Sequence, residues 1–122
     1  MKGFGNHVRR RRETLKARDP RFSVRQLAAR IGVEPSYLSK VERELEPPPS
    51  EAKIRALARE LEEDPDALLA RAGKVAADLQ KAICRRPTLF SQLIRELRNE
   101  PDAALLGLVD ELKTRTKRKE KP

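Results

Sequence analysis

Residues 24–42 read VRQLAARIGVEPSYLSKVE, and this stretch decides how the chain is expected to fold. Apolar side chains recur in it at the three- and four-residue spacing of amphipathic helices, on both sides of a glycine. Gly32 is suited to end a first helix because glycine adopts left-handed backbone angles without strain, and Pro35 is suited to begin a second. The positions expected to face the core are Leu27, Ala28, Ile31, Val33, Leu38, Val41 and Leu45.

Two short helices that cross steeply and are joined by a turn of three or four residues form a helix-turn-helix. The crossing needs a small residue where the helices touch, which Ala28 supplies, and a residue that tolerates left-handed angles, which Gly32 supplies. An ordinary helical hairpin that contains an alanine and a glycine is the alternative. Because the apolar positions also fall in register on both helices, the pattern favours the helix-turn-helix.

Helical periodicity also dominates the flanking sequence, and no segment alternates like a strand for more than a few residues. Towards the N-terminus a helix is predicted over about 4–17, followed by a loop at 18–22 and a helix cap at Ser23. Towards the C-terminus the prolines at 47–49 forbid helix and make a stiff connector. Beyond them, helices are predicted over about 50–61, 64–73, 74–86, 87–100 and 101–112.

The predicted fold class is therefore all-α, with a five-helix domain followed by a C-terminal appendage of two to three helices. We predict a helix-turn-helix domain at 1–73 and a helical dimerisation region at 74–113. Residues 114–122 are rich in Lys and Arg and lack apolar side chains, so a basic disordered tail is expected there.

The charge of the chain is high and unevenly distributed. Of the 122 residues, 39% are charged and only 3% are aromatic, and the net charge is +9. Residues 1–45 carry a net +7, residues 46–112 a net −3 and residues 113–122 a net +5. A positive field of this size attracts polyanions, so nucleic acid or an anionic membrane surface is the first partner to consider.

Several other classes of function are not expected from the composition. A single Cys cannot form an internal disulfide, and one Cys with one His cannot build a four-ligand metal site. Neither a glycine-rich phosphate loop nor a nucleophile motif is present, so we expect no enzyme and no cofactor. The N-terminus lacks the apolar run of a signal peptide, and no stretch approaches 18 apolar residues. A cytoplasmic protein without a membrane partner is expected.

Residues 4–72 resemble the phage-repressor-like helix-turn-helix family, also called the XRE family. The most specific matches are Leu27-Ala28, Gly32-Val33, Tyr37-Leu38-Ser39-Lys40-Val41-Glu42, the proline run and the apolar positions from Ile54 to Leu61. The resemblance implies a repressor-like five-helix domain and a DNA-binding transcriptional regulator. Three features depart from the family: Val24 stands where Gln is frequent, Glu44 where Gly is frequent, and the loop at 18–22 is longer. The second departure predicts that the helix ending near it runs on or frays.

Candidate DNA-binding residues follow from helical geometry together with this resemblance, which implies that the helix at about 35–45 enters the major groove. Side chains opposite its apolar stripe are candidates to read bases: Ser36, Tyr37, Ser39 and Lys40. The candidates for phosphate contacts are Arg9, Arg10, Arg25 and Arg43. Arg11 is expected to be either solvated or facing phosphate. For these residues a merely solvated polar side chain is the alternative, and for Tyr37 it is packing at the margin of the core.

Arg12 differs from the neighbouring arginines because it lies on the apolar stripe of Phe4, Val8 and Leu15. It should therefore point inward, where an unpaired charge is costly. Glu42 lies on the buried flank of its helix and is the natural partner. Members of the resembled family commonly carry such an Arg–Glu pair, and we interpret this one as structural.

We expect a sequence-specific double-stranded DNA-binding regulator, most simply a dimeric repressor. One helix-turn-helix reads only a few base pairs, so two copies on neighbouring half-sites are the usual solution. The residues expected to hold the dimer are Phe90, Leu93, Ile94, Leu97, Leu105, Leu108, Val109 and Leu112. A different possibility is that these helices fold back on the N-terminal domain. Two other functions remain open, namely an antitoxin-like module whose C-terminal helices bind another protein and a non-specific basic protein driven by its tail.

Overall fold

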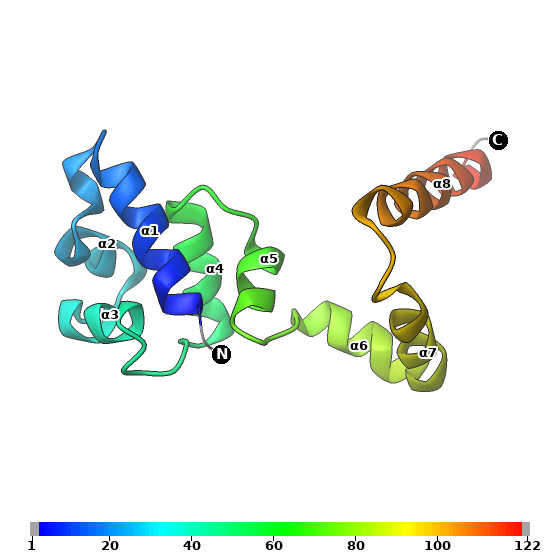
Figure 1. Ribbon diagram of the computed structural model, residues 1–122, viewed down its shortest axis with the longest axis horizontal. Helices are drawn as coiled ribbons and strands as arrows, with labels where there is room; N and C mark the ends of the chain where they lie inside the picture. The colour runs from blue at the N-terminus through cyan, green and yellow to red at the C-terminus, as the bar shows by residue number, and fades with distance from the viewer. Residues whose placement is uncertain (1–2, 121–122) are drawn as a thin grey trace. The chain divides into compact units, whose positions relative to one another are not determined.

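The computed structural model of the chain describes residues 3–120, and over that range it contains helices and no strand (Figure 1). The predicted all-α class is therefore confirmed. The chain divides into two compact units, and the boundary lies between Leu79 and Gln80. The elements are α1 (Phe4–Lys16), the 3₁₀ helix η1 (Pro20–Phe22), α2 (Val24–Ile31), α3 (Pro35–Glu42), α4 (Glu51–Glu60), α5 (Pro65–Arg71), α6 (Ala77–Arg85), α7 (Pro87–Leu97) and α8 (Asp102–Glu120).

Side-chain caps set the first residues of three helices in the N-terminal unit. Ser23 Oγ accepts a hydrogen bond from Gln26 N at 3.2 Å, and Ser50 Oγ accepts one from Lys53 N at 3.4 Å. Asp64 Oδ2 does the same for Ala67 N at 3.0 Å. Each cap satisfies a backbone N–H that has no partner within its own helix, and the one at Ser23 confirms the cap predicted there.

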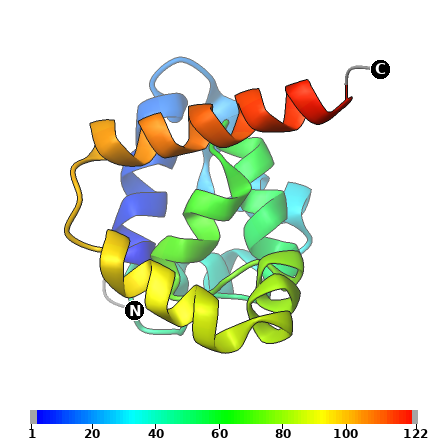
Figure 2. The same ribbon diagram turned by 90° about the vertical axis from the view of Figure 1, so that its right-hand side faces the viewer.

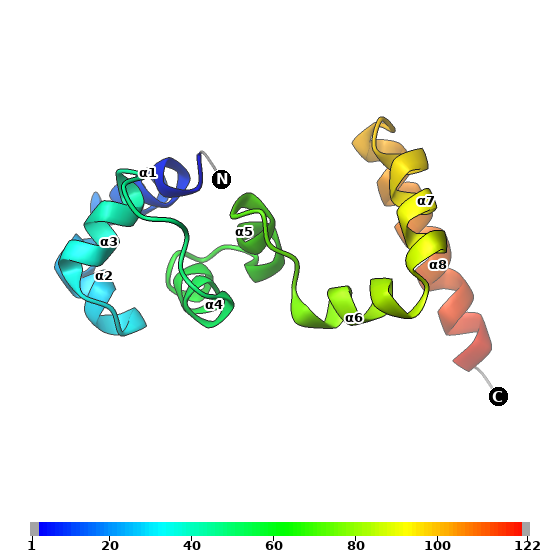
Figure 3. The ribbon, with the colours of Figure 1, turned by 90° about the horizontal axis from the view of Figure 1, so that it is seen from below.

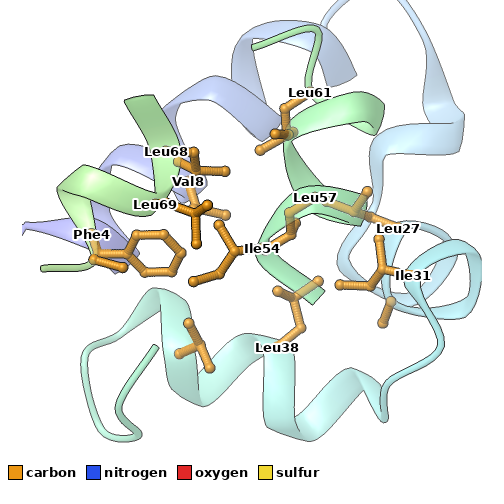
Figure 4. Close-up of a cluster of buried hydrophobic side chains, with 14 of the residues drawn as sticks. Phe4, Val8, Leu27, Ile31, Leu38, Ile54, Leu57, Leu61, Leu68 and Leu69 are labelled. Carbon is orange, nitrogen blue, oxygen red and sulfur yellow. The ribbon is translucent and has the colours of Figure 1, made fainter. Parts of the chain in front are cut away.

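The core of the N-terminal unit lies among α1 to α5, as Figure 4 shows. Helix α4 lies between the α2–α3 pair and α5, and its Ile54 and Leu57 are fully buried (Figures 1 and 3). Phe4 and Val8 reach this core from α1, and Leu69 reaches it from α5. The apolar stripes of five short helices thus close around one cluster, which fixes where α3 lies.

The N-terminal unit extends past the predicted boundary at residue 73. Ala76 is buried in the same core cluster, and Lys74 Nζ donates a hydrogen bond to the backbone oxygen of Pro49 at 2.8 Å. These contacts tie the segment after Gly73 to the proline connector. The compact unit accordingly ends near Leu79.

Helix α3 is shorter than the predicted 35–45, because it ends at Glu42. Glu44 adopts a left-handed backbone angle, with φ of 63°. Glu44 N then donates to Val41 O at 3.0 Å and Leu45 N to Lys40 O at 2.8 Å, so the helix terminus is closed and neither runs on nor frays. Leu45, which was expected on the buried side, lies beyond this turn and is 64% exposed.

Glu44 also caps a second helix. The N-cap residue of α1 is Gly3, which has no side chain that could cap the helix. Glu44 Oε1 accepts hydrogen bonds from the backbone N–H groups of Gly3 at 2.7 Å and Asn6 at 3.4 Å. A carboxylate is favourable at this position because it faces the positive end of the helix dipole. This interaction offsets the cost of a left-handed angle at a residue other than glycine.

Two further contacts hold α1 against the end of α3. Gly5 lies so close to α3 that a Cβ atom would overlap the backbone oxygen of Val41. Farther along α1, Arg12 Nε and Nη2 donate to Oε2 and Oε1 of Glu42 at 2.7 and 2.9 Å. Both side chains are buried, and Arg12 Nη1 also donates to the backbone oxygen of Phe22 at 3.1 Å. The hydrogen bonds with Glu42 raise the pKa of the Arg12 guanidinium above its usual value, although burial opposes this.

The C-terminal unit has no closed core of its own among the residues described. From Gln80 to Lys119 every described side chain is at least partly exposed. Helix α8 continues through Glu120, whereas a disordered tail was expected from residue 114, and Figure 2 shows it as one unbroken helix. Lys and Arg are good helix formers, and cations are favourable near a helix C-terminus. Residues 121–122 of the expected tail lie outside the described range.

Replacing Gly5 tests the close approach of α1 to α3. Gly5→Ala should lower the free energy of unfolding by about 1–3 kcal/mol, because the added methyl group meets backbone that cannot move aside. Gly107→Ala is the matched control, since a Cβ atom there has no neighbour within 4 Å. Chemical denaturation followed by circular dichroism measures both. Equal stability of the Gly5 variant and the natural sequence would contradict the packing described.

The Arg12–Glu42 pair can be tested in the same way. Arg12→Ala or Glu42→Ala should each destabilise the N-terminal unit by about 3–5 kcal/mol, because the remaining charge is buried without its partner. Arg9 and Glu13 form an exposed pair on the same helix, and breaking it should cost less than about 1 kcal/mol. Similar losses from the buried and the exposed pair would argue against a structural role for Arg12 and Glu42.

Candidate nucleic-acid interface

Helices α2 and α3 and the turn between them form the helix-turn-helix. Gly32 ends α2 with φ of 77° and ψ of 40°, the left-handed conformation expected from the sequence. Val33 N donates to Ala28 O at 3.0 Å, which closes the helix terminus. Leu27 and Ala28 on α2 and Leu38 on α3 are buried, so the crossing is packed on its inner side. The outer side of α3 is thereby turned towards solvent.

Lys53 supports this turn from α4. Its Nζ donates to the backbone oxygen of Ile31 at 3.0 Å and to that of Gly32 at 3.2 Å. These carbonyls have no partner within α2, and a cation is favourable at the negative end of a helix. Ile31 and Gly32 lie 22 and 21 positions before Lys53 in the sequence, so no local sequence pattern predicts these hydrogen bonds.

The residues predicted to read bases differ in their accessibility. Ser36 and Lys40 are exposed on α3, and Ser39 is half-buried. Tyr37 is also half-buried, with its ring packed against the core cluster. Within the described part of the chain, the side chains of Ser36 and Lys40 form no hydrogen bond or ion pair, so both are available to a ligand.

The residues predicted to contact phosphate are all exposed. Arg10 and Arg25 have no ion-pair partner among the side chains described, whereas Arg9 pairs with Glu13 at 3.1 Å. Arg43 Nε lies 3.4 Å from the backbone oxygen of Ser39. Arg11 was grouped with the solvated or phosphate-facing arginines, but its Nε donates to Leu61 O at 2.9 Å, which gives it a structural role.

Arg9 and Arg43 face the same small hollow on the surface. The hollow measures about 200 Å³ and is lined by Arg9, Arg12, Val24, Ser39, Glu42 and Arg43. Its lining thus includes one arginine of α1 and one from the C-terminal end of α3, together with both members of the buried ion pair. Val24 contributes only apolar surface, so any hydrogen bond to a ligand here must come from the arginines or Ser39.

The residues predicted to hold a dimer fall into two groups. Phe90, Leu97 and Leu105 are half-buried. Leu93, Ile94, Leu108, Val109 and Leu112 are exposed, with Ile94 at 54% and Leu112 at 57%. Leu106, at 64%, adds to the exposed apolar surface of α8 and was not expected from the stripe.

Other kinds of site find no support within residues 3–120. The described residues hold no cluster of three or more His, Cys, Asp and Glu suited to a metal ion. Cys84 is free and exposed, and His7 pairs with Glu63 at 2.6 Å. As far as the described helices go, none is long and apolar enough to cross a membrane.

Comparison with known proteins places the site in a family. The profile of a family described as helix-turn-helix domain matches residues 4–72, which comprise α1 to α5 and more than half of the chain. No curated protein and no solved structure gives a significant match. Domains of this kind are typically the DNA-binding, non-enzymatic parts of regulators. The chain belongs to the helix-turn-helix domain family.

Proposed function

We propose that the protein is a sequence-specific double-stranded DNA-binding transcriptional regulator, and that it acts as a dimeric repressor. The observation that carries the proposal is the state of α3. Its inner side is fixed by packing and by the Arg12–Glu42 pair, while Ser36 and Lys40 on its outer side are exposed and unengaged within the described residues. A rigid helix with free polar side chains is what reading the major groove requires.

Each side chain on this surface has a chemical role in the proposal. The ammonium group of Lys40 suits the O6 and N7 acceptors of guanine, and the Ser36 hydroxyl can donate to or accept from any base edge. Ser39 is half-buried, so its hydroxyl would extend less far towards a base than the side chains of Ser36 and Lys40. The ring of Tyr37 packs inward, so its hydroxyl is the part that remains for a base or a phosphate.

The hollow between Arg9 and Arg43 supplies the proposed phosphate contact. A phosphate there would accept charge-assisted hydrogen bonds from both guanidinium groups. Arg10 and Arg25 extend the positive surface on α1 and α2. Contacts of this kind position the protein on the duplex and supply much of its affinity, while base contacts supply specificity.

Dimerisation is proposed for the C-terminal unit, because none of its described side chains is buried while α7 and α8 expose apolar stripes. Isolated helices of such length are marginal in water, so their order is best explained by packing against a partner. A second copy presents the same patch and can bury both at once. It would also hold two α3 helices at the spacing of a palindromic site, about one helical turn of DNA.

The same exposed stripes also fit a second candidate function, an antitoxin-like module whose C-terminal helices cover a different protein. The apolar character of α7 and α8 does not by itself distinguish a second copy from another partner. The two candidate functions differ in one measurable property, because only the dimeric repressor requires the purified chain to form a dimer.

Substitutions on α3 test the DNA-reading role. Lys40→Ala or Ser36→Ala should keep the fold and weaken binding to the preferred duplex by about 1–3 kcal/mol each, with less effect on unrelated duplexes. The preferred duplex is obtained by selection from a random pool, and binding is measured by fluorescence anisotropy. Arg71→Ala removes an exposed cation from α5 and serves as control. No enriched sequence in the pool, or unchanged affinity of both α3 variants, would contradict the proposal.

Sedimentation of the full chain tests the dimer. The natural sequence should sediment as a dimer, and Ile94→Asp with Leu112→Asp should convert it to a monomer, because charges on the exposed stripes cannot be buried without cost. Gln92→Asp with Ala103→Asp is the matched control, since both residues are exposed on the same helices away from the stripes. A monomeric natural sequence would favour the antitoxin-like alternative.

A further inference from the structure

The last turns of α8 carry a dense run of positive charge. Residues 113–119 read KTRTKRK, which is five cations with no anion between them. Because α8 is helical through Glu120, these seven residues occupy about 10 Å of helix axis at about 1.5 Å per residue. One cation per about 2 Å is comparable with double-stranded DNA, which carries one phosphate per about 1.7 Å of its axis.

Within residues 3–120 these cations form no ion pair. The ion pairs found among the described residues join side chains between His7 and Asp66, and none involves a cation of residues 113–119. The hydroxyls of Thr114 and Thr116 donate to the backbone oxygens of Asp110 and Leu112, both at 3.0 Å. The threonines therefore face back along their own helix and leave the cations unengaged.

The helix dipole explains only part of this charge. Cations are favourable in the last turn of a helix, and the effect falls off within that turn. Lys113 and Arg115 lie before the last turn of α8, so they gain little from it. Their charge needs another explanation.

The order of apolar and basic residues along α8 indicates whether its cations suit a nucleic acid or a membrane surface. Its exposed apolar side chains end at Leu112, and its cations begin at Lys113. Successive residues lie about 100° apart around a helix, so the five cations point in several directions and share their length with no large apolar residue. A helix that lies on a membrane instead has its apolar and basic residues on opposite faces of the same stretch. A polyanion bound through charge alone fits residues 113–119 better.

We propose that residues 113–119 form a second, sequence-independent contact with DNA phosphates. The inference rests on the proposed DNA-binding function and deepens it, because it separates two sources of affinity. Helix α3 distinguishes sequences, whereas the end of α8 releases counterions from any duplex. The apolar stripe that precedes Lys113 remains free for the proposed partner copy.

The salt dependence of binding tests this contact in the full-length protein. Lys117→Gln, Arg118→Gln and Lys119→Gln are combined, and affinity is measured over a salt series for the selected duplex and for a scrambled one of equal length. The slope of log affinity against log salt should become shallower by about 0.9 per lost phosphate contact, which is about 2.7 for each bound copy of the chain, on both duplexes. The ratio between the two affinities should stay as in the natural sequence.

Two control variants isolate the segment from net charge and from damage to the helix. Arg85→Gln, Arg86→Gln and Arg95→Gln together remove three exposed cations from the same unit, and the slope should stay unchanged. Lys117→Arg with Lys119→Arg keeps the charge and should keep the slope. Circular dichroism checks that each variant retains its helix content.

An unchanged slope in the 117–119 variant would overturn the proposal, and so would an equal change in the 85–86–95 variant. Binding of the natural sequence to phosphatidylserine vesicles, lost in the 117–119 variant while the DNA slope stays constant, would assign the segment to a membrane instead and overturn it. Failure to discriminate the selected duplex from the scrambled one would contradict the role of α3 alone. The slopes of the variants would still decide the role of α8.

Discussion

The buried pair of Arg12 and Glu42 is the interaction on which the position of α3 depends. One guanidinium group joins three elements, because it donates two hydrogen bonds to Glu42 on α3 and a third to Phe22 just before α2. Desolvation offsets much of the attraction in such a pair, so its main effect is on orientation rather than on net stability. The donors of Arg12 are fixed in a planar fork, which allows few alternative positions for α3.

The other contacts that fix the helix-turn-helix also lie away from the surface proposed to read bases. Gly5 lets α1 approach the end of α3, and Glu44 joins the two by closing one helix and capping the other. Lys53 holds the end of α2 from α4. All of these contacts act at the C-terminal ends of α2 and α3, and none of them engages the exposed side chains of Ser36 and Lys40.

How far the sequence predicts this arrangement depends on the range of each interaction. The caps at Ser23, Ser50 and Asp64 involve residues three positions apart, and the left-handed Gly32 depends on glycine alone, so all were predictable. Glu44 has no local preference for a left-handed angle, and its partners lie 38 and 41 residues away. The helical period therefore predicted a continuation to Leu45 that the backbone does not make.

In the candidate site, too, local features were predictable from the sequence and long-range contacts were not. Exposure of Ser36 and Lys40 follows directly from the apolar stripe of α3, because opposite faces of a helix are set by its period. The structural role of Arg11 does not follow, since its acceptor is a backbone oxygen 50 residues along the chain. The composition of residues 114–119 predicted disorder, yet they continue a helix that was already formed by the apolar residues before them. Extending an existing helix costs much less than starting one, so a segment too polar to fold alone can still be helical here.

Continuity of α8 has a consequence for how the C-terminal unit can act. A disordered tail would spread its cations over many positions, whereas a helix holds them at fixed intervals next to the apolar stripe. Burying the apolar stripe against a partner lowers the free energy through the hydrophobic effect, whereas the cations lower it by binding a polyanion. The two surfaces occupy successive lengths of α8, and they adjoin at a hollow lined by Val109, Leu112, Lys113, Thr116 and Lys117. Arg115, Arg118 and Lys119 do not line this hollow, so a partner copy that covers the stripe would still leave them for a duplex, and each bound copy would bring positive charge to the same DNA.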